Sequence, residues 1–108
     1  MKTTLLFSYG TLQLPQIQRS LFGRELDGNH DQLTGYKLDR LKAEENEMNI
    51  ASYPIAIPTD DQKDWIEGMI YEISASELEV ADTYEGREYK RIMQSFLSGK
   101  SAWIYVKS

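Results

Sequence analysis

The stretch 65–86 constrains the fold most, because a strand pattern in it leads directly into a helix whose two ends are both marked. Residues 65–73 are rich in aromatic and β-branched side chains and carry the strongest strand signal of the chain. Gly68 in their middle predicts either a bulge or another group packed close to the backbone. Ser74-Ala75-Ser76-Glu77 then fits a capping box, and Gly86 suits a helix end, so a helix is predicted over 75–85.

The predicted helix places one carboxylate on its inward face. Leu78, Ala81 and Glu85 are spaced three and four residues apart, so they share the face that packs against the sheet. An inward glutamate has two ordinary explanations. It forms an ion pair, here with Arg87 or Arg91, or it serves as an acid or base in a cavity.

Residues before this unit predict a strand, a glycine turn and a first helix. Residues 3–9 read as a buried strand that ends at Gly10. The turn Tyr9-Gly10-Thr11-Leu12 either presents backbone N–H groups to a small ligand or is an ordinary strand end. A helix is expected from Pro15 to Gly23, with an apolar stripe facing the core and polar residues facing water. The stripe comprises Leu14, Ile17, Leu21 and Phe22, and the polar residues are Gln16, Gln18 and Arg19.

The remaining segments predict further strands. Residues 33–38 suggest a strand or a bent hairpin, and the two prolines in 50–58 suggest an edge strand or an extended loop. Residues 89–97 and 102–106 predict an antiparallel pair joined by a turn at 98–100. With five or six strands and two short helices in no regular alternation, the chain predicts an α+β fold. We expect a small mixed β-barrel or curled sheet flanked by the helices, in one domain over 1–108.

Composition narrows the function classes. A net charge of −5 with dispersed basic residues argues against nucleic-acid binding. The chain has no cysteine, and its one histidine, His30, lies in a polar run that suggests a loop or strand edge, so no metal site is expected. The acidic runs at 44–47 and 60–61 are typical of solvated loops. The apolar run at the start is too short for a signal sequence or a membrane span, and we expect a cytoplasmic protein without membrane contact.

The motifs, in their order along the chain, resemble those of the γ-glutamylcyclotransferase-like family, also called avirulence-induced-gene-like. The resemblance is carried by Phe7-Ser8-Tyr9-Gly10-Thr11-Leu12, by Glu67-Gly68-Met69-Ile70-Tyr71 and by the stretch 81–91, which holds Tyr84-Glu85 and Tyr89-Lys90-Arg91. It extends through the Tyr53-Pro54 region and the last stretch, 98–105.

The resemblance implies an enzyme that needs no cofactor and no metal and acts on a small γ-glutamyl amino acid or amine. In that chemistry the α-amine of the substrate attacks its own γ-carbonyl and releases 5-oxoproline, with Glu85 as general base and then general acid. Partial burial beside Tyr84 is expected to raise the pKa of Glu85. Backbone N–H groups of Tyr9, Gly10, Thr11 and Leu12 would bind the substrate carboxylate or the carbonyl oxygen.

The resemblance also assigns roles to three residues near the end of the chain. Tyr105 aligns with a tyrosine that closes the pocket, although a core aromatic is an equal alternative. Arg91 is expected to support the turn that carries Glu85 by bonding to loop carbonyls or to an acid, and Tyr89 to pack beside it.

Two features depart from the family pattern. Gln13-Leu14-Pro15-Gln16 stands where many relatives have a glycine, and the chain stops at Ser108, so no C-terminal lid is expected. The alternative function is a non-catalytic module of the same fold that binds a small metabolite or a protein. The sequence leaves the oligomeric state open.

Overall fold

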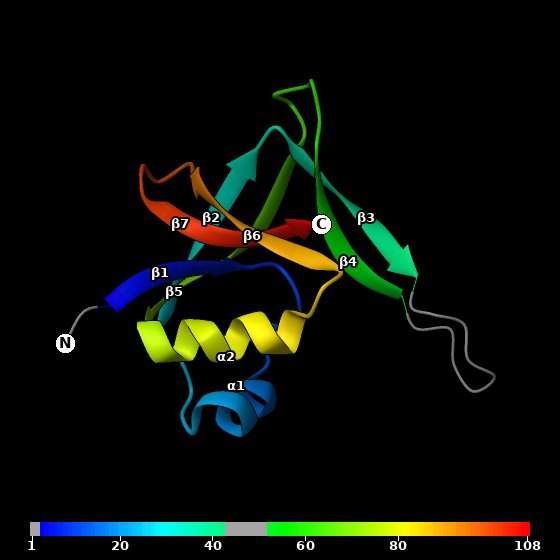
Figure 1. Cartoon of the computed structure of the whole chain (residues 1–108). Coiled ribbons are helices and arrows are strands. Elements are labelled where there is room, and N and C mark those ends of the chain that lie inside the picture. The colour runs from blue at the N-terminus through cyan, green and yellow to red at the C-terminus, as the bar shows by residue number, and fades with distance from the viewer. Residues whose placement is uncertain (1–2, 43–51) are drawn as a thin grey trace.

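The computed structural model describes residues 3–42 and 52–108, and Figure 1 shows them as one large sheet with two helices packed below it. The acidic run at 44–47 lies outside these residues. The helical elements are a 3-10 turn, η1 (Thr11–Gln13), and the helices α1 (Pro15–Phe22) and α2 (Ala75–Glu85). The strands are β1 (Thr3–Ser8), β2 (Gly28–Thr34), β3 (Tyr36–Lys42), β4 (Ser52–Pro58), β5 (Trp65–Ser74), β6 (Tyr89–Ser95) and β7 (Ser101–Lys107). Neither helix is long and apolar enough to cross a membrane within the described part of the chain.

The seven strands form a mixed sheet in the order β2-β5-β1-β7-β4-β3, and β6 pairs with β7 outside this path. β1 is antiparallel to β5 and parallel to β7. The opposite edge of β7 carries β6 over the whole strand. The predicted α+β class with a mixed sheet and two helices is therefore confirmed.

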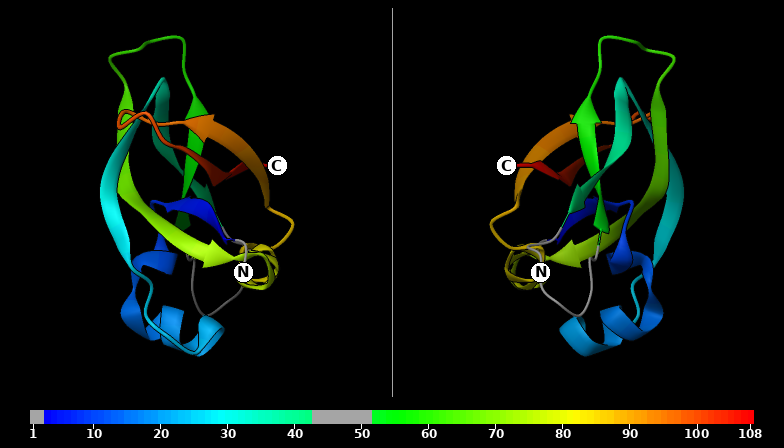
Figure 2. Two further views of the ribbon diagram at one scale, coloured as in Figure 1. Left: turned by 90° about the vertical axis from the view of Figure 1, so that its left-hand side faces the viewer. Right: turned by 90° about the vertical axis from the view of Figure 1, so that its right-hand side faces the viewer.

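The sheet is curled but not closed, so the barrel alternative was wrong. Within the described residues β2 pairs only with β5, β3 only with β4, and β6 only with β7, which leaves three edges unjoined. The two views in Figure 2 show this open, strongly twisted arrangement. Closure requires a ladder between these edges, and none is formed.

Gly35 explains how one segment supplies two edges of the sheet. Its φ of +80° turns the chain sharply between β2 and β3. The segment 33–38 holds the end of β2 and the start of β3, which pair with different strands and not with each other, so the hairpin alternative was wrong. The two prolines suggested that β4 is an edge strand or an extended loop, and both alternatives were wrong: it is a strand that pairs with β3 along its length and with β7 at Ala56. His30 lies exposed on the edge strand β2, as expected.

Gly68 is required for close packing, and the bulge alternative was wrong. Its register with β2 is unbroken. A Cβ built on Gly68 would lie 2.3 Å from the carbonyl oxygen of Ser8 and 2.7 Å from the Phe7 ring. No side chain fits there, so only glycine lets β1 and β5 pair at this point.

Each face of the sheet buries its own core, and β7 contributes to both through the alternation of its side chains. Ile104 and its i±2 neighbours join Phe7 and Phe96 in one core. Tyr105 and Trp103 point to the other face, where α2 packs through Leu78 and Ala81. The candidate site lies on this helical face.

The helix α1 begins at Pro15 and ends before Gly23, which has a φ of +73°, as expected. One assignment on it was wrong: Gln18 is buried rather than exposed. Its amide donates to the carbonyl of Leu12 at 2.7 Å and accepts from the N–H of Leu26 at 2.8 Å. Leu14, placed in the apolar stripe, is 43% exposed.

Candidate active site

The helix α2 holds the candidate site in a fixed position. Its capping box is formed: the N–H of Glu77 donates to the Ser74 hydroxyl at 3.1 Å, and the N–H of Ser74 donates to the Glu77 carboxylate at 2.9 Å. Arg24 donates two further hydrogen bonds to Glu77, each of 2.9 Å, and lowers the pKa of that carboxyl to about 2. The predicted helix 75–85 is thus confirmed at both ends.

Glu85 lies on the last turn of α2 and is half-buried. Burial raises the pKa of its carboxyl from 4.5 to about 7. Within the described part of the chain the carboxylate has no hydrogen bond and no ion pair. Burial is the main cause of the raised pKa values of Tyr9 and Tyr105, and the charge of Glu85 makes a smaller contribution, so the three groups lie close enough to interact electrostatically.

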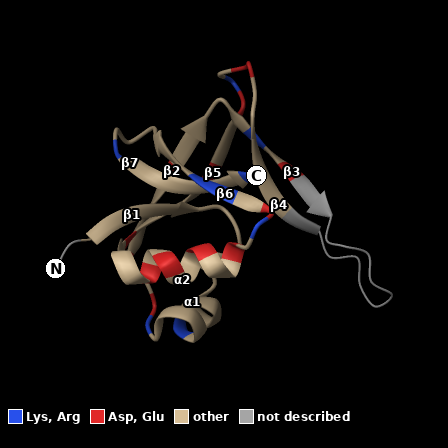
Figure 3. Cartoon of the chain, in the orientation of Figure 1, with Lys and Arg blue, Asp and Glu red and all other residues tan. Residues whose placement is uncertain are grey.

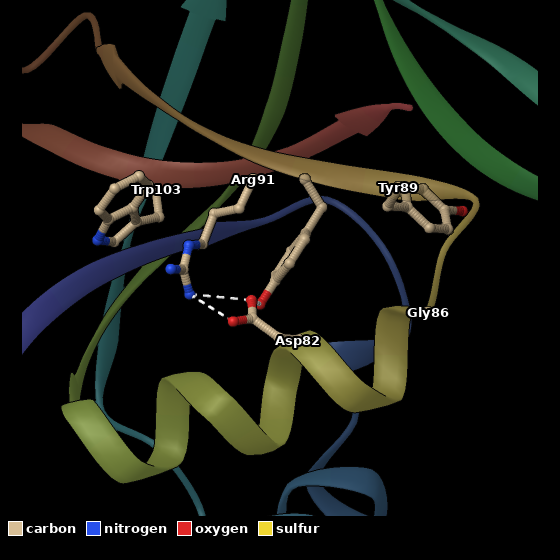
Figure 4. Close-up of a pocket in the computed structure, with 6 residues that line it drawn as sticks. Asp82, Gly86, Tyr89, Arg91 and Trp103 are labelled. Carbon is tan, nitrogen blue, oxygen red and sulfur yellow. Dashed lines mark hydrogen bonds and ion pairs between the residues drawn. The ribbon is translucent and has the colours of Figure 1, made fainter.

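Arg91, one of the two expected ion-pair partners of Glu85, is bound to Asp82 instead. Its Nη1 donates to the two carboxylate oxygens of Asp82 at 2.9 and 2.8 Å. The guanidinium also lies 4.5 Å from the centre of the Trp103 ring. Figure 4 shows Arg91 held between Trp103 and Asp82. Arg91 therefore pairs with an acid one turn before Glu85, and Glu85 is left without a partner among the residues that the structure describes.

Asp82 was not singled out from the sequence as a site residue, although it joins two residues that were. Besides the two bonds from Arg91, it accepts a hydrogen bond of 2.7 Å from the phenol of Tyr105. Its position could have identified it in the sequence, because it lies three residues before Glu85 and close to the inward face of the same helix. Arg91, Asp82 and Tyr105 thus tie α2 to both strands of the β6–β7 hairpin.

In the turn after β1, the side chain of Tyr9 is hydrogen-bonded to the sheet and the side chain of Thr11 is hydrogen-bonded to α2. The phenol of Tyr9 donates to the carbonyl of Tyr105 at 2.5 Å and accepts from the N–H of Ala56 at 3.0 Å. The Thr11 hydroxyl and the Tyr84 phenol share a hydrogen bond of 2.6 Å. The phenol of Tyr84 is therefore bound to the turn.

Two backbone donors of this turn are unused. The N–H groups of Gln13 and Leu14 donate to Gly10 and Thr11 carbonyls, as in a 3-10 turn. The N–H groups of Thr11 and Leu12 have no acceptor among the described residues. Of the predicted site residues, the structure joins the Tyr9 phenol to the carbonyl of Tyr105, buries the Leu12 side chain and joins the Thr11 hydroxyl to α2.

Tyr89 and Tyr105 both use their phenols for contacts within the protein. Tyr89 donates to the carbonyl of Pro54 at 3.0 Å, which ties β6 to β4. The ring of Tyr105 is buried and its phenol is held by Asp82. The phenol protons of both residues are therefore used within the protein, and contact with a substrate would be made by the rings or by the acceptor side of the phenol oxygens.

A pocket of about 480 Å³ lies between α2 and the β6–β7 hairpin. It is lined by Asp82, Gly86, Tyr89, Arg91, Trp103 and Tyr105, as drawn in Figure 4. Glu85 is not among these lining residues. No group of three or more acidic or histidine side chains that could hold a metal ion occurs within residues 3–42 and 52–108.

Residues 6–108 match the family model described as gamma-glutamyl cyclotransferase, AIG2-like, so the chain belongs to that family. The resemblance seen in the sequence is therefore confirmed. No curated protein matches the chain significantly in sequence.

Solved structures agree on the fold. A protein from Arabidopsis thaliana is 23% identical, with a TM-score of 0.77 over 99% of this chain and 70% of its own. A protein named gamma-glutamyl cyclotransferase is 16% identical, with a TM-score of 0.77 over 99% of this chain and 68% of its own. An AIG2-like protein from Mus musculus is 20% identical, with a TM-score of 0.65 over 100% of this chain and 79% of its own. At these identities the likeness concerns the fold, and family and fold together indicate a cyclotransferase-type protein with a small-molecule substrate.

Proposed function

We propose that this chain is a cyclotransferase that releases 5-oxoproline from a small γ-glutamyl amino acid or amine, with Glu85 as its general acid and base. The observation that carries the proposal is the state of the Glu85 carboxyl. It is half-buried, it has no partner among the described residues, and its pKa is raised to about 7. A carboxyl that serves only to hold the structure together would be paired.

The reaction needs a group that takes up and returns protons near neutral pH. The ionised Glu85 removes a proton from the α-ammonium of the substrate, and the free amine attacks the γ-carbonyl carbon. A five-membered ring forms, the bond between that carbon and the leaving nitrogen breaks, and Glu85 returns a proton to the leaving nitrogen. The attacking nitrogen gives up its second proton through the same carboxyl to the leaving amine, so the α-nitrogen loses two protons, the leaving amine gains two, and no further reactant is required.

A pKa near 7 suits both halves of this cycle. At neutral pH the ionised and the protonated forms of Glu85 are both populated, whereas an ordinary glutamate would be almost wholly ionised. The attacking and attacked groups belong to one molecule, so the protein has mainly to hold them in a near-attack geometry.

The unused N–H groups of Thr11 and Leu12 support a binding role for the turn after Gly10. They would bind the α-carboxylate of the substrate or stabilise negative charge on the γ-carbonyl oxygen. The Tyr84–Thr11 hydrogen bond links this turn to the helix that carries Glu85, so the two halves of the site would keep their relative position. We propose that the rings of Tyr9 and Tyr105 form the wall between them.

The test is release of 5-oxoproline from a panel of γ-glutamyl amino acids and γ-glutamyl amines by the wild type and two variants. Glu85→Gln removes the titrating group and keeps its size, and should reduce kcat at least about 100-fold. Glu79→Gln makes the same change on the exposed side of α2, a helix whose acidic residues are drawn in red in Figure 3, and should leave kcat unchanged. Folded wild-type protein with no turnover on any member of the panel would favour the non-catalytic binding module instead.

A further inference from the structure

The pocket between α2 and the β6–β7 hairpin is lined by residues that, apart from the ring of Tyr105, have no part in the proposed reaction. Its volume of about 480 Å³ falls within the usual range for small-molecule sites. Three of its walls are the rings of Tyr89, Trp103 and Tyr105, and the other two side chains carry opposite charges. Figure 4 shows Trp103 at one end and Tyr89 at the other, with the charged pair of Arg91 and Asp82 between them.

Some N–H donors of the Arg91 guanidinium are not used within the described part of the protein and could bind a ligand. A guanidinium has five N–H donors, and Arg91 uses only Nη1, which donates to both oxygens of Asp82. Nε and Nη2 have no acceptor among the described residues. The Asp82 contact and the Trp103 ring already fix the plane of the guanidinium, so little side-chain freedom would be lost on binding. The free donors suit a carboxylate.

Asp82 has a free hydrogen-bond acceptor position, which complements the free donors of Arg91. Its carboxylate offers about four lone-pair positions. It accepts two hydrogen bonds from Arg91 and one from Tyr105, so one position remains, on the oxygen that Tyr105 does not contact. A ligand that brought only a negative charge would be repelled by Asp82, and one that brought only a positive charge would be repelled by Arg91.

We propose that this pocket is a second binding site, for an α-amino acid with an aromatic or apolar side chain. The α-carboxylate binds the free donors of Arg91, the α-ammonium binds the free position of Asp82, and the side chain packs against the rings of Tyr89 and Tyr105. Glu85 has no part in this site, so the inference stands independently of the proposed reaction. An amino acid is also what cleavage of a γ-glutamyl amino acid would release, so the site would sense that product.

The experiment uses the two indole N–H signals of the intact protein in a two-dimensional NMR spectrum. Trp103 lines the pocket and Trp65 lies exposed at the start of β5, so one signal reports on the site and the other is an internal control. Trp65→Phe assigns them. The probes are L-phenylalanine, phenethylamine, which lacks the carboxylate, and 3-phenylpropionate, which lacks the ammonium.

L-Phenylalanine should move the Trp103 signal saturably and leave the Trp65 signal in place. Each of the other two probes should bind at least about tenfold more weakly, the effect of losing one charge-assisted contact. Arg91→Lys should weaken binding of L-phenylalanine by a similar factor, while Arg87→Lys, the same change at an exposed position outside the pocket, should not. If Arg91→Lys fails to fold, the comparison of the three probes on wild type decides alone.

Three results would overturn the site. The first is no saturable movement of the Trp103 signal with L-phenylalanine. The second is equal binding of the three probes, since then neither charge is recognised. The third is loss of binding in Glu85→Gln, because that would place the ligand in the Glu85 region. If the variant retains binding and lacks turnover, the two sites are separate.

Discussion

The half-buried Glu85 carboxyl, which has no partner within residues 3–42 and 52–108, should make the folded protein less stable as pH rises through neutrality. Burial raises its pKa from 4.5 to about 7. Below about pH 4.5 the group is protonated in both the folded and the unfolded chain, so it adds no dependence on pH. Between these two values the unfolded chain releases a proton that the folded chain retains, and the free energy of unfolding falls with rising pH. Above about pH 7 the whole cost of a buried charge is present.

The size of this cost follows from the two pKa values. At about 1.4 kcal/mol for each pH unit, the gap between 4.5 and about 7 corresponds to roughly 3 kcal/mol. A domain of ordinary stability has only about 5–15 kcal/mol in total, so the effect should be large enough to measure. Such a cost is expected where a residue is retained for chemistry rather than for stability.

The assay is urea unfolding of the wild type and Glu85→Gln at a series of pH values between about 5 and 8.5. The variant should gain stability over the wild type by roughly 2.5 kcal/mol across this range, because it lacks the titrating group. Taking the difference between the two proteins removes the contribution of the other carboxyls, including Glu77. Glu79→Gln, at an exposed position, should show a difference that does not change with pH. A flat difference for Glu85→Gln, or a difference that falls with pH as for an ion-paired carboxylate, would refute the reasoning.

Two further predictions concern stability. Gly68→Ala should lower the free energy of unfolding by about 3 kcal/mol or more, because the added methyl group overlaps a backbone carbonyl. The control is Gly10→Ala, whose Cβ would meet its nearest neighbour at 3.6 Å. It should cost less than about 1 kcal/mol in the same urea assay. Equal losses for the two glycines would contradict the packing argument. Asp82→Ala should cost about 1–2 kcal/mol, a value reduced by partial exposure, because it leaves a guanidinium and a phenol without their acceptor. A loss no larger than that of Asp60→Ala, in an exposed turn, would show that these bonds contribute little.

The elements that could be predicted from the sequence are those whose signals are local. Ser74 and Glu77 cap α2 through bonds within one turn, and Gly86 ends the helix, so both boundaries can be read from neighbouring residues. The β6–β7 hairpin is likewise marked by Gly99, which adopts a φ of +94° in the turn.

The order of the strands could not be read in the same way. The side chains of β1 alternate identically whichever strands flank it, so nothing local indicates that β5 and β7 are its neighbours. Whether a curled sheet closes depends on pairing between edges that are far apart in sequence. The sequence therefore could not decide between a barrel and a curled sheet, and the structure shows the curled sheet. Gln18 was misplaced for a related reason: the groups that satisfy its amide are backbone atoms outside its own helix.

For the site, spacing along α2 was enough to place Glu85 on the inward face. It was not enough to decide its partner, because Arg91 could in principle reach either Asp82 or Glu85. The structure resolves this choice in favour of Asp82. The raised pKa of Glu85 follows from that choice together with burial, and neither can be seen in the sequence alone.

The most direct test of the account is the pH dependence of 5-oxoproline release, measured as kcat/KM on the best γ-glutamyl substrate of the panel. Wild type should show a limb with a pKa near 7, as expected for the Glu85 carboxyl, and Glu85→Gln should lose both the activity and that limb. Turnover that survives in folded Glu85→Gln with the same pH profile would contradict the central claim and assign the proton transfer to another group.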